Sequence, residues 1–315
     1  MRVVFFGTPE IAVPALDALQ SVAQVVGVVC PPDRPTGRGL RSSPCAVKRR
    51  AHELGIQVFQ PERVRDGGLQ TWLAALNLDA ALVLAFGRIL PQAVLDTPKQ
   101  GCLNLHASLL PKHRGAAPIA HAILAGDDCT GVSLMQMTAG LDEGPVYTSR
   151  SVAIDSSCTA GTLGQRLAGL AADIVSEDLV PVLNGEVPST EQDPSRATWA
   201  PPLTAEDELL KFEQDAISLE RRVRALAPRP GASSSLRGRR LKVLAAKAEA
   251  IDLALPPGAV KVGDGRRVLV ATGSGALELL EVQLAGKRAI SARDLLNGRS
   301  ISPGDFLVPS PGASP

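Results

Sequence analysis

The sequence predicts an α/β protein with a mostly parallel sheet, followed by a second, smaller domain that is rich in β-strands. Three observations lead to this prediction. At 315 residues the chain is long for a single hydrophobic core, which favours two domains. Short apolar runs alternate with segments of helical spacing over the first half, which is typical of a parallel sheet covered on both faces. After about residue 185 the pattern changes to a Pro-rich stretch and then to alternating runs joined by Gly-containing turns.

The apolar runs of the first part are the predicted strands. "RVVFFG" ends in a glycine, and the helical segment after it has Thr8 as its predicted N-cap and Pro9 at its first helical position. A second helix is expected from Ala46 to Leu54, whereas residues 31–44 are too rich in Pro, Gly and Arg for regular structure. The predicted strands are residues 2–7, 23–30, a short strand near Val58, 79–87, the run that contains Asn104 and His106, and 130–137.

The second part of the chain follows residues 185–207, which have four prolines and little periodicity, as in a linker that crosses the surface. Residues 216–226 have the spacing of an amphipathic helix. Strands of alternating character follow, joined by Gly-containing turns, and they predict a meander or a small barrel. The predicted elements here are strands within 239–249 and 258–286 and a final helix near 291–298.

The net charge of +1 argues against a generally basic nucleic-acid coat, but the charge is segregated along the chain. Residues 34–50 hold six basic residues and no acid, and residues 221–247 hold nine basic residues and no acid. Residues 155–215, by contrast, hold twelve acids against three basic residues. This segregation favours a polyanionic partner bound at two places, although a charge run is more often only a solvated surface.

The cysteines and the N-terminal residues indicate the cellular compartment in which the protein is expected to act. Five cysteines without a CxxC pair favour reduced, mostly structural thiols in a cytoplasmic protein. The first apolar run is broken from Gly7 to Glu10, so we do not expect a signal peptide. No apolar run approaches the roughly 18 residues that a membrane helix needs. We therefore expect no membrane partner.

Several common sites are not supported by the motifs. The turn "GTPEIAV" lacks the G-x-G-x-x-G of a dinucleotide site, and no phosphate-binding G-x-x-x-x-G-K-[ST] loop is present. His106, His113 and His121 are seven and eight residues apart, which puts them on no common strand or helix face, so we expect no metal site. A nucleophilic Ser108 would need G-x-S-x-G, which is absent.

The remaining candidate is the pair Asn104 and His106. Their period-2 spacing places both side chains on one face of a strand. An amide donor beside an imidazole suits acyl transfer, because the amide can hold a carbonyl oxygen as it becomes negative and the imidazole can accept a proton. Asp142, in a Gly-flanked loop, is a candidate to orient the imidazole. The competing interpretation is a core histidine with satisfied hydrogen bonds and an aspartate that only forms a turn.

Longer matches point to a family. The runs "NLHASLLPKHRGAAPI" and "TGVSLMQMTAGLDEGPV" closely resemble the signature of the formyltransferases that use 10-formyltetrahydrofolate. The runs "FFGTPEIAVPAL", "PPDRPTGRG" and "FGRILP" extend the resemblance through the N-terminal part, and "GKRAISARDLLNGR" extends it nearly to the C-terminus. This ordered set covers nearly the whole chain, and it is most similar to the branch of the family that acts on methionyl-tRNA.

The resemblance implies a fold and a domain organisation. It implies a Rossmann-like formyltransferase domain, a linker and a small, OB-like β-barrel domain that binds tRNA. We place these at residues 1–186, 187–204 and 205–309, with a disordered tail at 310–315. No metal is implied, and we expect a monomeric, cytoplasmic enzyme.

The resemblance also implies the site residues and the reaction. The family's catalytic Asn, His and Asp fall on Asn104, His106 and Asp142. Its folate-binding segment falls on Ser108, Leu109, Leu110 and Pro111. The implied reaction moves a formyl group from 10-formyltetrahydrofolate to the α-amine of methionine on initiator tRNA and releases tetrahydrofolate. Asn104 would donate to the developing oxyanion, His106 would take the amine proton or stabilise the tetrahedral intermediate, and Asp142 would orient His106.

Three arginines are expected to contact the tRNA. Arg34, Arg38 and Arg41 are predicted to lie in a loop after the second strand, from which they could reach the acceptor end. Residues 221–247 would hold the RNA backbone further away. The sequence departs from the family at two points: "APRPGASSS" has Arg229 where a Trp-containing segment is usual, and "GRGLRSSP" lacks a pair of lysines that often follows the second glycine.

Other functions stay open on the residues alone. A formyltransferase with a small amine acceptor, such as a glycinamide ribonucleotide or an amino sugar nucleotide, would share the N-x-H…D core without needing a basic C-terminal domain. A hydrolase of 10-formyltetrahydrofolate would release formate without an acceptor. A non-catalytic RNA-binding protein with a decayed enzyme core is the alternative of a different class.

Overall fold

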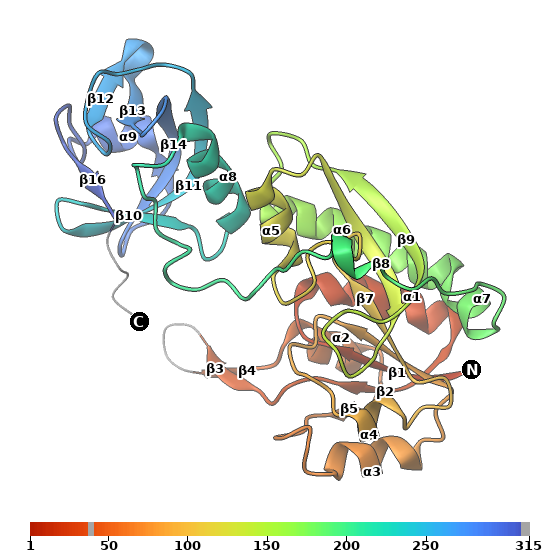
Figure 1. The fold of residues 1–315 in the computed structure, drawn as a ribbon. Helices are drawn as coiled ribbons and strands as arrows, with labels where there is room; N and C mark the ends of the chain where they lie inside the picture. The colour runs from red at the N-terminus through yellow and green to blue at the C-terminus, as the bar shows by residue number, and fades with distance from the viewer. Residues whose placement is uncertain (37–40, 310–315) are drawn as a thin grey trace. The chain divides into compact units, whose positions relative to one another are not determined.

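The computed structural model describes residues 1–36 and 41–309, so Arg38 and the tail 310–315 lie outside the described residues. The chain divides into two compact units (Figure 1). Unit 1 comprises Met1–Pro118, Cys129–Ala153 and Gly164–Pro201, and unit 2 comprises Ile119–Asp128, Ile154–Leu163 and Pro202–Pro315.

Unit 1 is built on a seven-stranded sheet in the order β5-β2-β1-β6-β7-β8-β9. The first five strands pair in parallel, and β8 and β9 add two antiparallel strands at one side. The predicted α/β class with a mostly parallel sheet is therefore confirmed. The strands are β1 (Arg2–Gly7), β2 (Gln24–Val29), β5 (Val58–Phe59), β6 (Ala80–Leu84), β7 (Cys102–His106), β8 (Cys129–Gln136) and β9 (Val146–Ala153).

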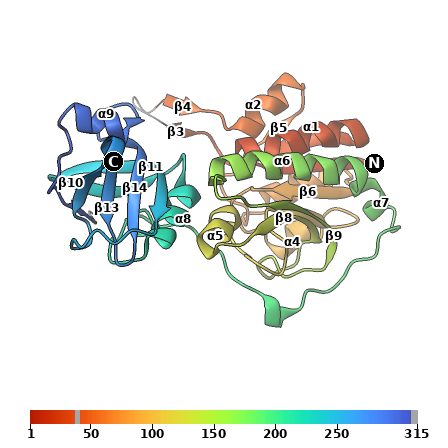
Figure 2. The ribbon, with the colours of Figure 1, turned by 90° about the horizontal axis from the view of Figure 1, so that it is seen from above.

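Helices cover both faces of this sheet, with α1 and α6 on one face and α3 and α4 on the other (Figures 1 and 2). Side chains of alternate residues in β1 point to opposite faces of the sheet. On one face, Val4 and Phe6 pack against Leu69 and Leu73 of α3. Within or partly within unit 1 the helices are α1 (Val13–Val22), α2 (Ala46–Glu53), α3 (Gly68–Ala75), α4 (Gln92–Leu95), α6 (Ala160–Glu177) and α7 (Leu179–Leu183), with short 3-10 turns at Glu10–Ala12 and Pro194–Arg196.

Two local predictions in unit 1 are wrong. Thr8 does not cap a helix: its hydroxyl donates to the carbonyl of Phe86 at 3.2 Å, and a 3-10 turn separates it from α1. Pro9 is the N-cap residue of the 3-10 turn and Ala12 that of α1, so Thr8 occupies neither N-cap position. The stretch 31–44 is not irregular throughout, because β3 (Arg34–Thr36) pairs antiparallel with β4 (Arg41–Ser43). A two-stranded ribbon has only edge strands, where a proline can be accommodated.

Unit 2 contains an antiparallel sheet in the order β12-β13-β14-β11-β10-β16, with β15 beside β14. Its ends are joined, since the Val260 amide donates to the Asp305 carbonyl and the Leu307 amide to the Gly258 carbonyl, both at 2.8 Å. The sheet therefore closes into the small barrel that the sequence predicts. The strands are β10 (Ala232–Leu236), β11 (Arg239–Glu249), β12 (Val260–Gly263), β13 (Arg267–Ala271), β14 (Ala276–Leu284), β15 (Ile290–Ser291) and β16 (Leu307–Val308).

Two predicted helices complete unit 2. Helix α8 (Ala216–Leu226) has the predicted bounds, and it begins where the Asp215 carboxylate accepts a hydrogen bond from the Ser218 amide. Its apolar face joins the barrel core, where Leu219 and Val223 pack with Phe212. The last helix, α9 (Ala292–Asn297), is capped by Ser291, and α5 (Pro118–Ala125) falls almost entirely in this unit. Among the described residues, no helix has both the length and the apolar character to cross a membrane.

Candidate active site

Strand β7 carries the two polar residues that the sequence singled out. It lies between β6 and β8, and its register sets Asn104 opposite Met135 and His106 opposite Ser133. Asn104 and His106 are 9% and 6% exposed, so both side chains are buried on the same face near the carboxyl end of the strand. Among the described residues, the Asn104 side chain forms no hydrogen bond within the protein, which leaves its amide available to a ligand.

The imidazole of His106 is held at one nitrogen. Its Nε2 lies 2.9 Å from the backbone carbonyl of His113. Because a carbonyl can only accept, Nε2 carries the proton and donates it. In the neutral ring the lone pair is then on Nδ1, which lies 3.6 Å from Oδ2 of Asp142. That separation is longer than a hydrogen bond but suits an ion pair once Nδ1 is protonated.

Asp142 is held from two sides by residues that the sequence analysis did not single out. Its Oδ2 accepts a hydrogen bond from the Gly115 amide at 2.9 Å. Its backbone carbonyl accepts one from Nε2 of Gln192 at 2.9 Å, and the same nitrogen donates to the Gly144 carbonyl at 2.7 Å. Asp142 itself has a left-handed backbone with φ +51°, which an unsupported aspartate adopts only at a cost.

A buried arginine completes this support. The guanidinium of Arg114 donates through Nε and one terminal nitrogen to Oε1 of Gln192, at 3.0 and 2.8 Å. Arg114 is only 5% exposed. The neighbouring Gly115 has φ +125°, and a Cβ there would lie 2.6 Å from the carbonyl oxygen of Ala200, so only glycine fits. We name Arg114, Gln192 and their contacts with the Asp142 loop the Arg114–Gln192 clasp.

The segment Ser108–Pro111 follows β7 directly. The Ser108 hydroxyl is fully buried and donates to the Lys112 carbonyl at 2.5 Å, so it shapes the turn. The hydroxyl of Ser133 donates to the Ser108 carbonyl at 2.8 Å and accepts from the Leu110 amide at 3.2 Å. Leu109 and Leu110 are half-buried and supply apolar surface close to His106 along the chain.

The structure describes two of the three arginines that the sequence predicts to bind tRNA. Arg34 lies on β3 and Arg41 on β4, where Arg41 is opposite Thr36, so these two belong to a hairpin and not to the predicted loop. Arg38 lies outside the described residues. The three belong to the segment between β2 and α2, whereas the residues around His106 come from β7 and the segments that follow it.

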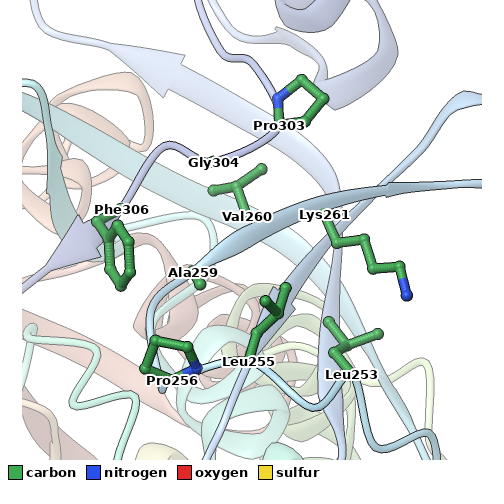
Figure 3. A pocket seen from close by; sticks show the side chains of 9 residues that line it. All are labelled: Leu253, Leu255, Pro256, Ala259, Val260, Lys261, Pro303, Gly304 and Phe306. Carbon is green, nitrogen blue, oxygen red and sulfur yellow. The ribbon is translucent and has the colours of Figure 1, made fainter.

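A hollow in unit 2 lacks the side chains that acid–base chemistry needs. A hollow of about 320 Å³ at the barrel seam of unit 2 is lined mainly by apolar side chains, among them Leu253, Pro256 and Phe306, with Lys261 at one side (Figure 3). It has no residue that could act as a general base at neutral pH. In the part of the chain that the structure describes, no three His, Cys, Asp or Glu side chains lie close enough to hold a metal ion.

Comparison with known families defines the class. Residues 1–179 match the family described as formyl transferase, and residues 202–300 match the formyl transferase C-terminal domain. Solved structures of under 25% identity share the fold: WlaRD, a sugar 3N-formyl transferase, has a TM-score of 0.67 at 16% identity and covers 91% of this chain and 99% of its own. The chain is a two-domain formyl transferase in its fold.

Curated relatives narrow this class. The methionyl-tRNA formyltransferase of Sorangium cellulosum is 48% identical over 309 residues, which are 98% of this chain and 99% of the relative. That of Halorhodospira halophila is 45% identical over 305 residues, 96% of this chain and 98% of the relative. The chain belongs to the methionyl-tRNA formyltransferase family. The resemblance inferred from the sequence motifs is thereby confirmed.

Proposed function

We propose that the chain transfers the formyl group of 10-formyltetrahydrofolate to the α-amine of methionine esterified to initiator tRNA. The products are tetrahydrofolate and N-formylmethionyl-tRNA. The observation that carries this proposal is the arrangement on β7: an uncommitted Asn104 amide lies two residues before an imidazole whose free nitrogen faces Asp142. Membership of the methionyl-tRNA formyltransferase family supports the choice of acceptor.

The proposed mechanism follows from two groups that can bind the substrates, the side-chain amide of Asn104 and Nδ1 of His106. The amine attacks the formyl carbon, and the carbonyl oxygen becomes negative as the tetrahedral intermediate forms. Asn104 donates to that oxygen from a buried site, where a hydrogen bond to a developing charge is stronger than in water. Nδ1 of His106 accepts the amine proton, and Asp142 stabilises the imidazolium at 3.6 Å. When the bond to the folate nitrogen breaks, that proton goes to the leaving amine.

We propose that Ser108–Pro111 helps to bind the folate. The backbone of this segment is held by Ser133, and its half-buried leucines give an apolar surface for an aromatic ring system. Structures that share the fold support a folate ligand: HypX from Aquifex aeolicus was solved with tetrahydrofolic acid and a Helicobacter canadensis N-formyltransferase with folinic acid.

The RNA-binding proposal concerns residues 205–309 and the arginines at 34, 38 and 41, with residues 1–186 as the catalytic domain and 187–204 as the connection. Most basic side chains of residues 221–247 bind other residues of unit 2. The members of this run that do so are Arg222, Arg224, Arg237, Arg240, Lys242 and Lys247. Among the described residues, Arg229 and Arg239 of this run are both exposed and without an ion pair, so we propose that they contact phosphates.

An assay with labelled donor tests the function. The full chain is incubated with 10-formyltetrahydrofolate labelled in the formyl group, and methionyl-tRNA, small amines or no acceptor are offered separately. Label on methionyl-tRNA is the expected result. Label on an amino sugar nucleotide or glycinamide ribonucleotide alone would establish a different acceptor, and label released as formate without acceptor would establish a hydrolase. None of the five cysteines forms a disulfide, as is usual for proteins of the reducing cytoplasm, where we propose that the enzyme acts. We propose that it acts as a monomer.

A further inference from the structure

A hollow of about 400 Å³ in unit 1 lies where the strand order of the sheet reverses. Its lining comes from segments that follow three parallel strands and from the segment before α2: Thr8 after β1, residues 31–33 after β2, Gly87 and Arg88 after β6, and residues 43–45. From β1 the chain goes to β2 on one side and later to β6 on the other, so β1 and β6 form the switch point of the sheet. Open α/β sheets bind ligands beyond the carboxyl ends of their strands at such a point. We name this hollow the switch-point pocket.

The register of the sheet places the switch-point pocket close to His106. Phe6, Val83 and Asn104 share one row across β1, β6 and β7. Two residues further along, Thr8 follows β1 and His106 ends β7. Neighbouring strands are about 4.8 Å apart, so the backbones of Thr8 and His106 lie about 10 Å apart. An amino acid whose amine lies at Nδ1 of His106 can therefore place its side chain in this pocket.

The segment between the pocket and His106 carries little bulk on this side. Ala85, directly after β6, is exposed and has a left-handed backbone with φ +51°. Gly87 has φ +78°, and a Cβ there would meet nothing within 4 Å. Between them, Phe86 is buried, and its ring packs edge-on against Phe6 with the ring centroids 5.3 Å apart. The left-handed alanine costs free energy, as residues at binding sites often do, and the bulky ring of this segment lies in the core.

Most polar side chains of the pocket are bonded to other groups of unit 1. Those with such hydrogen bonds are the Thr8 hydroxyl, the Asp33 carboxylate, Sγ of Cys45 and the Arg88 guanidinium. Asp33, for example, accepts hydrogen bonds from the Lys48 ammonium at 2.6 Å and from Nε2 of Gln60 at 2.9 Å. A polar ligand would have to compete with these partners. Ser43, the remaining polar side chain of the lining, is exposed.

The rest of the lining is apolar and rigid. Pro31, Pro32 and Pro44 are half-buried and present three rings to the pocket. Each ring fixes its own backbone φ, so these walls need little ordering when a ligand binds. A pteridine needs hydrogen-bond partners along its edges, which proline rings do not offer. A flexible apolar chain suits such walls, and a thioether is polarisable and adapts to an irregular shape.

We propose that the switch-point pocket binds the side chain of the methionine that is esterified to tRNA and thereby selects the aminoacyl group. This inference rests on the proposed function, from which it takes the acceptor. With the α-amine at Nδ1 of His106, the side chain extends past Ala85 to the prolines. Selection is by fit and desolvation, because a side chain with an amide or a charge would lose its water here without gaining a partner. On the same tRNA, norleucine should therefore react nearly as well as methionine, and glutamine poorly.

A photoreactive acceptor tests the location in the unmodified full chain. Initiator tRNA charged with a diazirine analogue of methionine is irradiated with the enzyme and tetrahydrofolate, and the cross-linked peptides are mapped by mass spectrometry. Cross-links within residues 31–33, 43–45 or 85–88 are the expected result. A map that contains none of these three segments would overturn the proposal, whether the cross-links lie elsewhere or are absent.

A variant that narrows the pocket tests the selection. Ser43→Phe adds a ring to the lining at an exposed position. We expect kcat/KM for methionyl-tRNA to fall at least about tenfold, but that for the same tRNA charged with alanine to change less than about threefold, because the short side chain does not reach the pocket. Ser151→Phe, at an exposed position of β9, is the matched control and should change neither value. An unchanged ratio between the two aminoacyl groups in Ser43→Phe would overturn the proposal.

The two readouts separate this proposal from the proposed function. Formylation that proceeds equally well with methionine, alanine and glutamine on the same tRNA would overturn the selection pocket and leave the proposed function standing. Cross-links in the switch-point pocket of a chain that never transfers the formyl group would refute the proposed function and leave the pocket standing.

Discussion

Gln192 donates a hydrogen bond from its side-chain amide to the backbone carbonyl of Asp142 at 2.9 Å, across 50 residues of sequence. On its other side the same amide accepts two hydrogen bonds from Arg114, which is adjacent to the glycine that holds the Asp142 carboxylate. The Arg114–Gln192 clasp therefore connects the loop after β7, the loop after β8 and residues near the end of unit 1. It maintains the 3.6 Å approach of Asp142 to His106.

The first prediction concerns this clasp. Gln192→Leu removes both donors to the Asp142 loop, so we expect kcat to fall by about 10- to 100-fold, as a displacement near 1 Å at a reacting group can do. The KM values for both substrates should stay within about twofold of the starting values. Steady-state kinetics with methionyl-tRNA measures both, and thermal denaturation checks that the fold is kept.

A second change distinguishes two roles of Gln192. In Gln192→Glu, one carboxylate oxygen can still accept hydrogen bonds from Arg114. The N–H donors are lost, however, and the second carboxylate oxygen faces the carbonyls of Asp142 and Gly144. If holding the Asp142 loop is what matters, this variant should be at least as impaired as Gln192→Leu. Near-normal kcat in Gln192→Glu would show that the residue serves only Arg114. Glu191→Gln, at the exposed neighbouring position, should have no effect.

The second prediction concerns the reacting groups. His106→Ala and Asp142→Asn should each lower kcat at least roughly 100-fold, the usual contribution of a general acid–base group, while folate binding persists. Single-turnover formylation and equilibrium folate binding measure the two properties separately. Turnover close to that of the unchanged enzyme in either variant would remove that residue from the mechanism.

The third prediction compares two arginines at the β10–β11 turn. Arg239 is exposed without an ion pair, whereas Arg237 pairs with Asp305 at 2.7 Å. Arg239→Ala should weaken tRNA binding and reduce the slope of log affinity against log salt by about one unit. Arg237→Ala, the matched control, should leave the salt slope unchanged. Equal slopes for all three proteins would exclude Arg239 from the RNA interface.

The fourth prediction concerns Arg38, which lies outside the described residues and between two glycines in "TGRGL". Arg38→Ala should raise the KM for methionyl-tRNA or lower kcat, with unchanged folate affinity, because it removes a charge from the segment that is predicted to meet the acceptor end. The salt slope should also fall by about one unit. Arg65→Ala, at an exposed position elsewhere in unit 1, is the control. Kinetics and a salt slope that match this control would mean that Arg38 is only a solvated residue.

The fifth prediction concerns stability and pH. Hydrogen bonds from the Ser218 hydroxyl and amide lower the pKa of Asp215, so the charged cap stabilises the folded state above the aspartate's ordinary pKa. That contribution is lost as pH falls through the lowered folded-state pKa. Asp215→Ala should cost on the order of 0.5–1 kcal/mol at pH 7, since the cap is exposed, and progressively less in acid.

Calorimetry of the full chain tests this at a series of pH values. Asp215→Asn is the matched variant, because asparagine caps a helix about equally well but does not titrate. Its melting temperature should therefore cross that of the unchanged protein as the pH falls. A constant difference between Asp215→Ala and the unchanged protein at every pH would show that the ionised cap contributes nothing.

Local patterns determined much of this protein. The continuous apolar runs specify the parallel strands because both faces of the sheet are buried, and the helix 216–226 has the predicted bounds because its cap and apolar spacing agree. The alternation in β7 put Asn104 and His106 on one face, since side-chain direction in a strand has a period of two. Motif order was enough to indicate the family. The roles of Asn104, His106 and Asp142 stay predictions.

Tertiary contacts decided the rest. The hydroxyl of Thr8 donates to the carbonyl of Phe86, 78 residues away in the sequence. The hydrogen bond from Arg114 to Gln192 spans the same sequence separation. Periodicity and capping rules act over a few residues, so they carry no information about partners that meet only when the chain folds back on itself. The 3.6 Å approach of His106 to Asp142 is of this kind, because it depends on a left-handed aspartate held by Gly115 and Gln192. The sequence alone could name the candidate side chains, but only packing could set the distance and direction between them.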